Sequence, residues 1–134
     1  PRLDIFRAES MGFEPKTRFL GEDVGVVTSV GLAFAEGLRA NGLLPVVGHY
    51  PGLGAATRGD NGALAILDDH KTLAEEVIFP FARAADGNVA GLLVGHIAVP
   101  VLDEESPERP ASLSPRLVQT FLRPINSCQA SLIE

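Results

Sequence analysis

Hydrophobic residues recur at helical spacing in one long segment of the chain, residues 24–40. Their intervals of three and four residues are those of one face of an α-helix. Glu22 and Asp23 precede the segment, where the positive end of the helix dipole favours anions, and Gly42 follows it as a terminator. The hydrophobic positions of this face are Val27, Val30, Phe34 and Leu38.

Two further segments have helical character. Residues 71–85 form a second amphipathic pattern, and Pro80 within it is expected to bend the helix or to mark a break. Ser114 followed by Pro115 is typical of an N-cap and a first helical residue, and opens a third helix through Leu122. The apolar face of the second helix consists of Leu73, Val77, Ile78 and Phe81.

Four segments are apolar without helical spacing. Residues 43–49 and 89–99 are hydrophobic on both faces, as strands buried in a parallel sheet are. Residues 1–6 and 130–133 give two shorter strands at the ends of the chain. A glycine-rich stretch, 51–63, has the composition of a loop.

Strands and helices therefore alternate along the chain, which is the rhythm of an α/β fold with a parallel sheet. The pattern predicts about four parallel strands and three helices within a single domain, residues 1–134. A complete (β/α)₈ barrel takes about 250 residues. The chain is thus expected to form either half of a barrel or a small open α/β sheet.

Composition narrows the function classes. The formal net charge is −6 and the Lys and Arg residues do not cluster, so neither nucleic acid nor an anionic membrane surface is an expected partner. The longest apolar runs, 90–94 and 96–102, are far too short to span a bilayer. Cys128 is the only cysteine, so no internal disulfide is expected, and a reducing cytoplasm is the compartment that fits.

Five short motifs resemble segments of family 3 glycoside hydrolases, in the same order along the chain. Residues 47–54, Val-Gly-His-Tyr-Pro-Gly-Leu-Gly, resemble that family's K-H-F-P-G-H-G segment. Residues 1–5 resemble P-V-L-D-I, and 18–23 resemble R-x-F-G-x-D. Residues 96–103 resemble A-H-x-x-Y-P-x-L-D, and 111–115 resemble P-A-T-L-S-P. The resemblance is to the bacterial β-N-acetylglucosaminidase branch, and it implies part of a TIM-type barrel.

The resemblance also implies a sugar site. By resemblance, Arg18 and His49 match substrate-contacting positions, and the ligand implied is an N-acetylglucosamine-containing glycan. Reactive groups in such barrels lie at the carboxyl ends of the strands, where His49, His96 and Asp4 all fall. Arg18, His49 and His96 are therefore the candidate sugar-binding residues, and the sequence predicts neither a metal nor an organic cofactor.

The departures from the family pattern concern catalysis. The family lysine before the motif histidine is Gly48 here, and the second histidine of the motif is Leu53. A D-S-H loop supplies the acid/base pair in the N-acetylglucosaminidase branch. Asp60 matches its aspartate, but the histidine position falls on Asn61 or Gly62, neither of which can shuttle a proton.

The position of the nucleophile is also altered. Glu134 stands where the family has an aspartate, and its longer side chain would displace the carboxylate. His70, the nearest downstream histidine, lies beside Asp69 at the start of a helix and is expected to be a surface residue.

Three functions remain open: an impaired glycosidase relative that retains sugar binding, a fragment of an active retaining β-N-acetylglucosaminidase of peptidoglycan turnover, and a self-associating module without catalysis. Because a half-barrel exposes sheet edges and an apolar face, we expect either a homodimer or association with the rest of a barrel.

Overall fold

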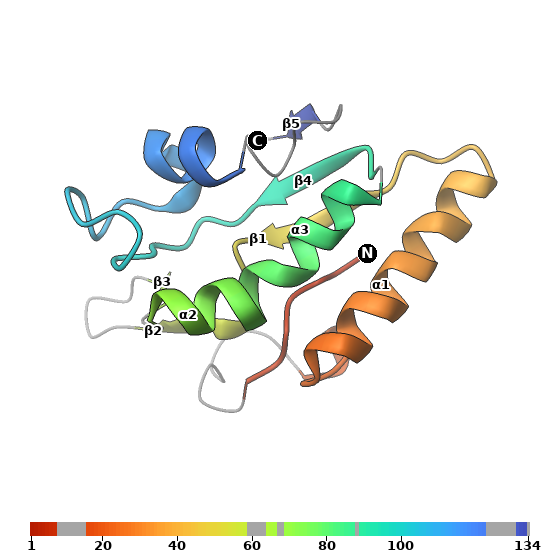
Figure 1. The fold of residues 1–134 in the computed structure, drawn as a ribbon, viewed down its shortest axis with the longest axis horizontal. Helices are drawn as coiled ribbons and strands as arrows, with labels where there is room; N and C mark the ends of the chain where they lie inside the picture. The colour runs from red at the N-terminus through yellow and green to blue at the C-terminus, as the bar shows by residue number, and fades with distance from the viewer. Residues whose placement is uncertain (8–15, 59–63, 67–68, 88, 123–130, 134) are drawn as a thin grey trace.

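The computed structural model describes residues 1–7, 16–58, 64–66, 69–87, 89–122 and 131–133. A parallel sheet lies against two long helices, and a group of loops extends from one end of the sheet (Figure 1). The strands are β1 (Val46–Tyr50), β2 (Thr57–Arg58), β3 (Leu64–Ala65), β4 (Gly91–Val94) and β5 (Ser131–Ile133). The helices are α1 (Val24–Ala40), α2 (His70–Thr72), α3 (Phe79–Asp86), the π-helical segments Leu73–Ile78 and Arg116–Leu122, and short 3₁₀ turns at Lys16–Arg18, Leu53–Ala55 and Ala111–Leu113.

The main sheet has the order β1-β4-β5, and both pairings are parallel. The amino-terminal segment adds one parallel bridge, from Arg2 to Gly48, on the outer side of β1. The predicted α/β fold with a parallel sheet is therefore confirmed. The strands are shorter than the apolar runs that predicted them, because residues 43–45 and 95–99 run beyond the sheet.

The ends of α1 follow from its capping residues. The side chain of Asp23 accepts a hydrogen bond from Val26 N at 2.8 Å, which satisfies one free donor of the first turn. At the other end Gly42 has φ of 77°, and its N–H and that of Leu43 bond to the carbonyls of Arg39 and Leu38. This is the hydrogen-bond pattern of a Schellman motif, which favours glycine at that position.

The buried face of α1 is not the one that the hydrophobic spacing suggests. Val30 and Phe34 are 47% and 58% exposed. A Cβ on Gly31 would collide with the side chain of Leu3, which reaches down onto the helix backbone. Small residues therefore face the sheet, because they let the amino-terminal segment approach, and larger ones turn outward. The buried positions are Val27, Thr28, Gly31 and Ala35.

The second predicted helix runs from His70 to Asp86 without a break. Its first turn is capped by Asp69, whose side chain accepts from Thr72 N at 2.8 Å. In the turns before Pro80 the helix takes the wider π form, over Leu73–Ile78, and Pro80 is the second residue of α3. Proline has no N–H and its ring crowds the carbonyl four residues earlier, so the wider turn accommodates it. The helix therefore continues through Pro80 with a change in its hydrogen-bonding pattern, in place of the predicted bend or break.

The third helix begins where Ser114 predicts. Ser114 Oγ accepts from Leu117 N at 3.2 Å and donates to Asp103 Oδ2 at 2.6 Å, with both side chains buried. The cap therefore also connects the helix to the loop that carries Asp103. The rest of the helix, Arg116–Leu122, is π-helical.

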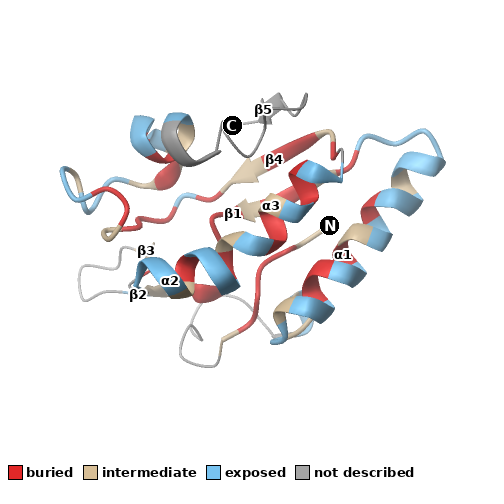
Figure 2. Ribbon diagram, viewed as in Figure 1, coloured by how far each residue is buried: buried red, intermediate tan, exposed pale blue. Residues whose placement is uncertain are grey.

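The buried residues, red in Figure 2, include two hydrophobic clusters among the described residues. The sheet core lies between the sheet and the helices, and the loop core lies among the segments that follow the strands. A small antiparallel hairpin, β2 with β3, which the sequence pattern did not predict, borders the loop core. The sheet core comprises Leu3, Ala35, Val47, Tyr50, Phe81, Ala84, Val89 and Leu92. The loop core comprises Ala55, Ala56, Ile66, Leu73, Val77, Ile97, Val99, Leu102, Ala111 and Leu117.

Candidate functional site

His49 lies near the carboxyl end of β1, at an irregularity in the sheet. Gly48 pairs with Leu93 and Tyr50 pairs with Val94, so His49 is an extra residue without a partner on β4. The peptide bonds that precede His49 and Pro51 are both cis. A bulge of this kind re-aims a side chain and frees its backbone groups from the ladder.

The backbone N–H of His49, which has no partner on β4, donates to the side chain of Asp4. The Asp4 carboxylate is fully buried, yet it accepts hydrogen bonds from three N–H donors. These are His49 N at 3.1 Å, His49 Nδ1 at 3.0 Å and Leu53 N at 2.6 Å. Arg2 adds a positive charge, with Nε 3.8 Å from Asp4 Oδ2. Buried carboxylates are stable only when they are paired and hydrogen-bonded. These contacts hold the Asp4 carboxylate in place, and its hydrogen bond to Nδ1 orients the His49 ring.

Arg18 belongs to the same end of the sheet. It is exposed and ends the 3₁₀ turn Lys16–Arg18. The next residue, Phe19, packs edge-on against Phe6 at 5.4 Å between ring centroids, and the Arg2 guanidinium lies 5.0 Å above the Phe19 ring. The backbone that carries Arg18 is thus anchored beside the segment that supplies Asp4.

His96 follows β4 and is the counterpart of His49 on the next strand. The two strand ends are tightly packed, since a Cβ placed on Gly95 would lie 3.3 Å from His49 Cβ. His96 itself is exposed, and its Nδ1 lies 2.7 Å from the hydroxyl of Ser112. The structure therefore places both histidines at the carboxyl ends of neighbouring strands, with different partners.

The two predicted catalytic positions, Asp60 and Glu134, lie outside the described residues, as do Asn61 and Gly62. His70 is exposed and directly follows the N-cap of α2, which fits its expected place on the surface. Within the described ranges, no group of three or more His, Cys, Asp or Glu side chains could hold a metal ion. No helix in the same ranges is long and apolar enough to cross a membrane.

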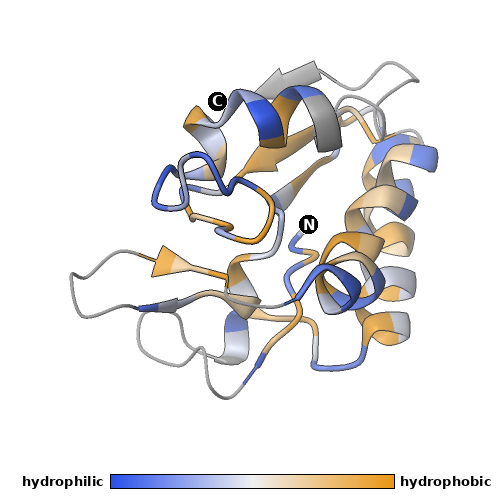
Figure 3. Cartoon of the chain, turned by 60° about the vertical axis from the view of Figure 1, so that its left-hand side comes forward, coloured by the Kyte–Doolittle hydropathy of each residue, from blue (hydrophilic) through white to orange (hydrophobic). Residues whose placement is uncertain are grey.

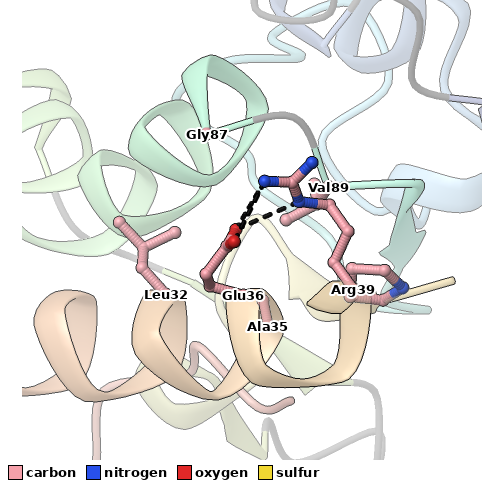
Figure 4. A pocket seen from close by; sticks show the side chains of 7 residues that line it. Leu32, Ala35, Glu36, Arg39, Gly87 and Val89 are labelled. Carbon is pink, nitrogen blue, oxygen red and sulfur yellow. Dashed lines mark hydrogen bonds and ion pairs between the residues drawn. The ribbon is translucent and has the colours of Figure 1, made fainter. Parts of the chain in front are cut away.

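A cleft of about 180 Å³ lies at the opposite end of the sheet (Figure 4). Pro45 and Val89 line it, and these residues precede β1 and β4, so the cleft is at the amino ends of the strands. Arg39 and Glu36 also line it and form an ion pair that engages both carboxylate oxygens, with Nε 3.0 Å from Oε2 and Nη2 3.0 Å from Oε1. In barrels of this kind the amino-terminal face contributes stability and the carboxyl-terminal face contributes chemistry. The cleft is therefore not part of the candidate site.

Asp4 is the functional candidate to which sequence reasoning assigned no role. The prediction placed it at a strand end, but only the structure shows that it holds His49. A signal was present in the sequence: an acidic residue inside an apolar strand requires a partner, because an unpaired buried charge is very costly.

The family of the chain follows from comparison with known proteins. The family model described as the glycosyl hydrolase family 3 N-terminal domain matches residues 1–126. The chain therefore belongs to glycoside hydrolase family 3, and its parallel α/β sheet is a part of that family's TIM-type barrel domain.

Within the family, the chain is similar to β-hexosaminidases. It is 39% identical over 101 residues to a β-hexosaminidase of Mycobacterium tuberculosis, covering 72% of this chain and 24% of that protein. A secreted glycosyl hydrolase of Arthroderma benhamiae is 34% identical over 110 residues, covering 80% and 31%. The crystal structure of a β-N-acetylhexosaminidase from Beutenbergia cavernae superposes with a TM-score of 0.80 at 27% identity, covering 98% of this chain and 40% of that one. The chain thus spans about a quarter of one of these curated relatives and about a third of the other.

Proposed function

We propose that this chain supplies one side of a binding site for N-acetylglucosamine-type sugars and does not hydrolyse them by itself. The observation that carries the proposal is the His49 ring, held by buried Asp4 at the carboxyl end of β1. Imidazole and guanidinium groups are suited to sugar hydroxyls, and Arg18 lies at the same end of the sheet. The names of the relatives, which include β-hexosaminidases, support the sugar class.

The catalytic part of the proposal rests on residue types. A retaining glycosidase needs a carboxylate nucleophile and a second group that acts as acid and base. Asn61 and Gly62, at the family's acid/base histidine, offer no group that titrates near neutral pH. Glu134 in place of the aspartate would shift the nucleophile by about one methylene, and a displacement of about 1 Å can cost a hundredfold in rate.

Binding and hydrolysis are tested separately. N-acetylglucosamine is titrated into the ¹⁵N-labelled chain, and we expect shifts of backbone amides around His49 that saturate at millimolar sugar. His49→Ala should abolish them, whereas His70→Ala, at an exposed histidine that directly follows the N-cap of α2, should not. Hydrolysis of a chromogenic N-acetylglucosaminide should stay at the rate of the buffer. Absence of sugar-induced shifts at millimolar concentration would refute the binding role, and turnover would refute the catalytic part.

A second candidate is favoured by the share of the relatives that the chain covers, 24% to 31%. In this alternative the chain is a fragment of an active β-N-acetylglucosaminidase, whose remaining barrel strands complete the site. A longer parent protein that hydrolyses the chromogenic substrate would support it. Failure of such a parent to turn over the substrate would leave the impaired relative as the explanation.

We further propose that two copies of the chain associate through the outer face of α1. Val26, Val30 and Phe34, the outer stripe, are 48%, 47% and 58% exposed and lie four residues apart on one side of the helix. Figure 3 shows hydrophobic residues along this helix. In the described sheet β5 is also an edge strand. Exposed apolar faces and open edges both favour association, and two-fold pairing through the outer stripe would cover the apolar face.

Light scattering tests the association. We expect the mass of a dimer for the chain and the mass of a monomer for Phe34→Glu. Leu113→Glu is the matched control, because Leu113 is 66% exposed on a different face, in the turn Ala111–Leu113. A monomeric mass for the unmodified chain would contradict the proposal and would favour covering of the stripe by further strands and helices of a longer barrel.

A further inference from the structure

The hydrogen bonds of Asp4 restrict the chemistry of the His49 ring. A carboxylate accepts hydrogen bonds and donates none, so the atom that faces it, Nδ1, must carry the hydrogen. The Asp4 oxygens act as acceptors throughout this arrangement, because His49 N and Leu53 N also point their hydrogens at them and the Arg2 Nε lies 3.8 Å away. Nδ1 of His49 is therefore protonated whether the ring is neutral or charged.

The other ring nitrogen is left for a ligand. The His49 side chain is 27% exposed, whereas the Asp4 side chain is fully buried. Asp4 is the one hydrogen-bonding partner of the ring among the residues that the structure describes. Nε2 lies on the edge of the imidazole away from Nδ1, and with Nδ1 protonated it is a lone-pair acceptor in the neutral ring.

We infer that Asp4 is a positioning residue that locks the Nδ1–H tautomer of His49, so that Nε2 accepts a hydrogen bond from a sugar hydroxyl. This inference rests on the proposed sugar-binding function for its ligand, but the tautomer itself does not. It also gives the site a preference: a hydroxyl, which can donate, is bound at Nε2, and a group that can only accept is not. A methyl ether at the contacted hydroxyl would lose that donor.

The geometry sets His49 apart from the neighbouring His96. The partner of His96 is the hydroxyl of Ser112, which can donate or accept, so the contact fixes neither tautomer. The bulge and the two backbone N–H bonds to Asp4 also fix the position of the carboxylate itself. His96 thus serves as an internal reference in the same spectrum.

The tautomers are read from long-range ¹H–¹⁵N spectra of the ¹⁵N-labelled 134-residue chain, which has 3 histidines. The measurement is made at about pH 8.5, two units above the ordinary histidine pKa of about 6.5. We expect protonated Nδ1 and unprotonated Nε2 for His49. A His49 ring with its hydrogen on Nε2 in the unmodified chain overturns the inference without any substitution.

Substitution then separates positioning from folding. Asp4→Asn keeps the shape of the side chain but gives an amide nitrogen that can donate to the ring, and we expect the Nε2–H form of His49 to appear. Ser112→Ala, the matched control, should change the signals of His96 alone. The dissociation constant for N-acetylglucosamine should rise about tenfold in Asp4→Asn, by analogy with metal-ligating histidines, whose affinity falls about 10- to 100-fold when the orienting partner is lost.

The two proposals fail in different ways. If the unmodified chain shows the Nδ1–H tautomer of His49 and binds no sugar, the proposed function fails and the positioning role of Asp4 stands. If sugar binds and Asp4→Asn leaves both the tautomer and the dissociation constant unchanged, the positioning role fails. Should Asp4→Asn not fold, the tautomer of the unmodified chain still decides the inference.

Discussion

Two histidines stand at the ends of neighbouring strands, and they are held in opposite ways. His49 contacts a fully buried carboxylate that also binds two backbone N–H groups, whereas His96 is exposed and contacts one hydroxyl. The His96 side has a buried acid as well, but Asp103 bonds to Ser114 and serves the cap of a helix. Both sides therefore have a histidine and a buried aspartate, but only His49 contacts its aspartate. The path of the backbone determines which acidic side chain each histidine can reach.

Among the substitutions that test this comparison, Asp4→Ala is expected to lower the free energy of unfolding the most. The substitution leaves His49 N and Leu53 N without their acceptor in a buried place, and it removes the carboxylate that lies 3.8 Å from Arg2 Nε. Loss of one member of a buried charged network costs about 3 kcal/mol or more. Urea denaturation should show this loss as a lower midpoint with an unchanged slope. A loss below about 1 kcal/mol would mean that water replaces the carboxylate easily.

On the His96 side the largest effect is expected for Ser114→Ala. The change removes the N-cap of the third helix and the hydrogen bond to buried Asp103, at 2.6 Å. A lost cap costs about 1 kcal/mol, and an unsatisfied buried acceptor adds about 1 kcal/mol or more. The free energy of unfolding should therefore fall by about 2 kcal/mol. Equal losses for Ser114→Ala and Asp4→Ala would show that the two sides are built alike.

Tyr50→Phe tests the sheet core beneath His49. Tyr50 is fully buried and packs edge-on against Phe81, and its hydroxyl has no hydrogen-bond partner among the described residues. Removal of an unsatisfied buried hydroxyl should stabilise the chain by about 1 kcal/mol in urea denaturation. A loss of stability instead would reveal a partner for the hydroxyl.

The same substitution has a pH dependence. Burial raises the pKa of Tyr50 above its ordinary value of 10.0, so the folded chain keeps this tyrosine neutral while the unfolded chain ionises it. Ionisation of Tyr50 in the unfolded chain therefore lowers the free energy of unfolding. The free energy is unaffected by this ionisation below pH 10.0 and falls as the pH rises above that value. The advantage of Tyr50→Phe should thus widen above that pH, and a constant difference would argue against burial as the cause.

Ser112→Ala is expected to have the smallest effect. The hydrogen bond to His96 lies at the surface, and surface substitutions outside special structural features stay within about 0.5 kcal/mol. The midpoint of thermal unfolding should hardly move. A loss as large as that of Ser114→Ala would show that His96 supports the loop core and is not merely a surface residue.

Local signals account for most of the elements. Asp23, Gly42, Asp69 and Ser114 mark helix ends in the sequence, and each forms the cap or terminator that its type favours. Such signals act between residues a few positions apart, so no distant contact is needed to interpret them. The boundaries of the strands were less well predicted, because a parallel strand ends where its neighbour ends.

The chemistry of the site required the fold. His49 could be singled out by its motif, but Asp4 is 45 residues away, and the bulge that brings the two together is a property of strand pairing. The buried face of α1 was likewise decided by a distant residue, since Leu3 packs onto Gly31 and turns Phe34 to the surface.

The sequence by itself therefore determined the family, the alternation of strands and helices and the end of the sheet at which the candidate residues lie. Hydrophobic spacing, caps and short motifs are written locally along the chain. Only the tertiary structure decided which carboxylate hydrogen-bonds to His49 and which apolar residues of α1 are exposed. It also decided where the helix takes the π form that accommodates Pro80. These outcomes depend on contacts between distant segments, whose strength comes from burial and close packing that no local pattern records.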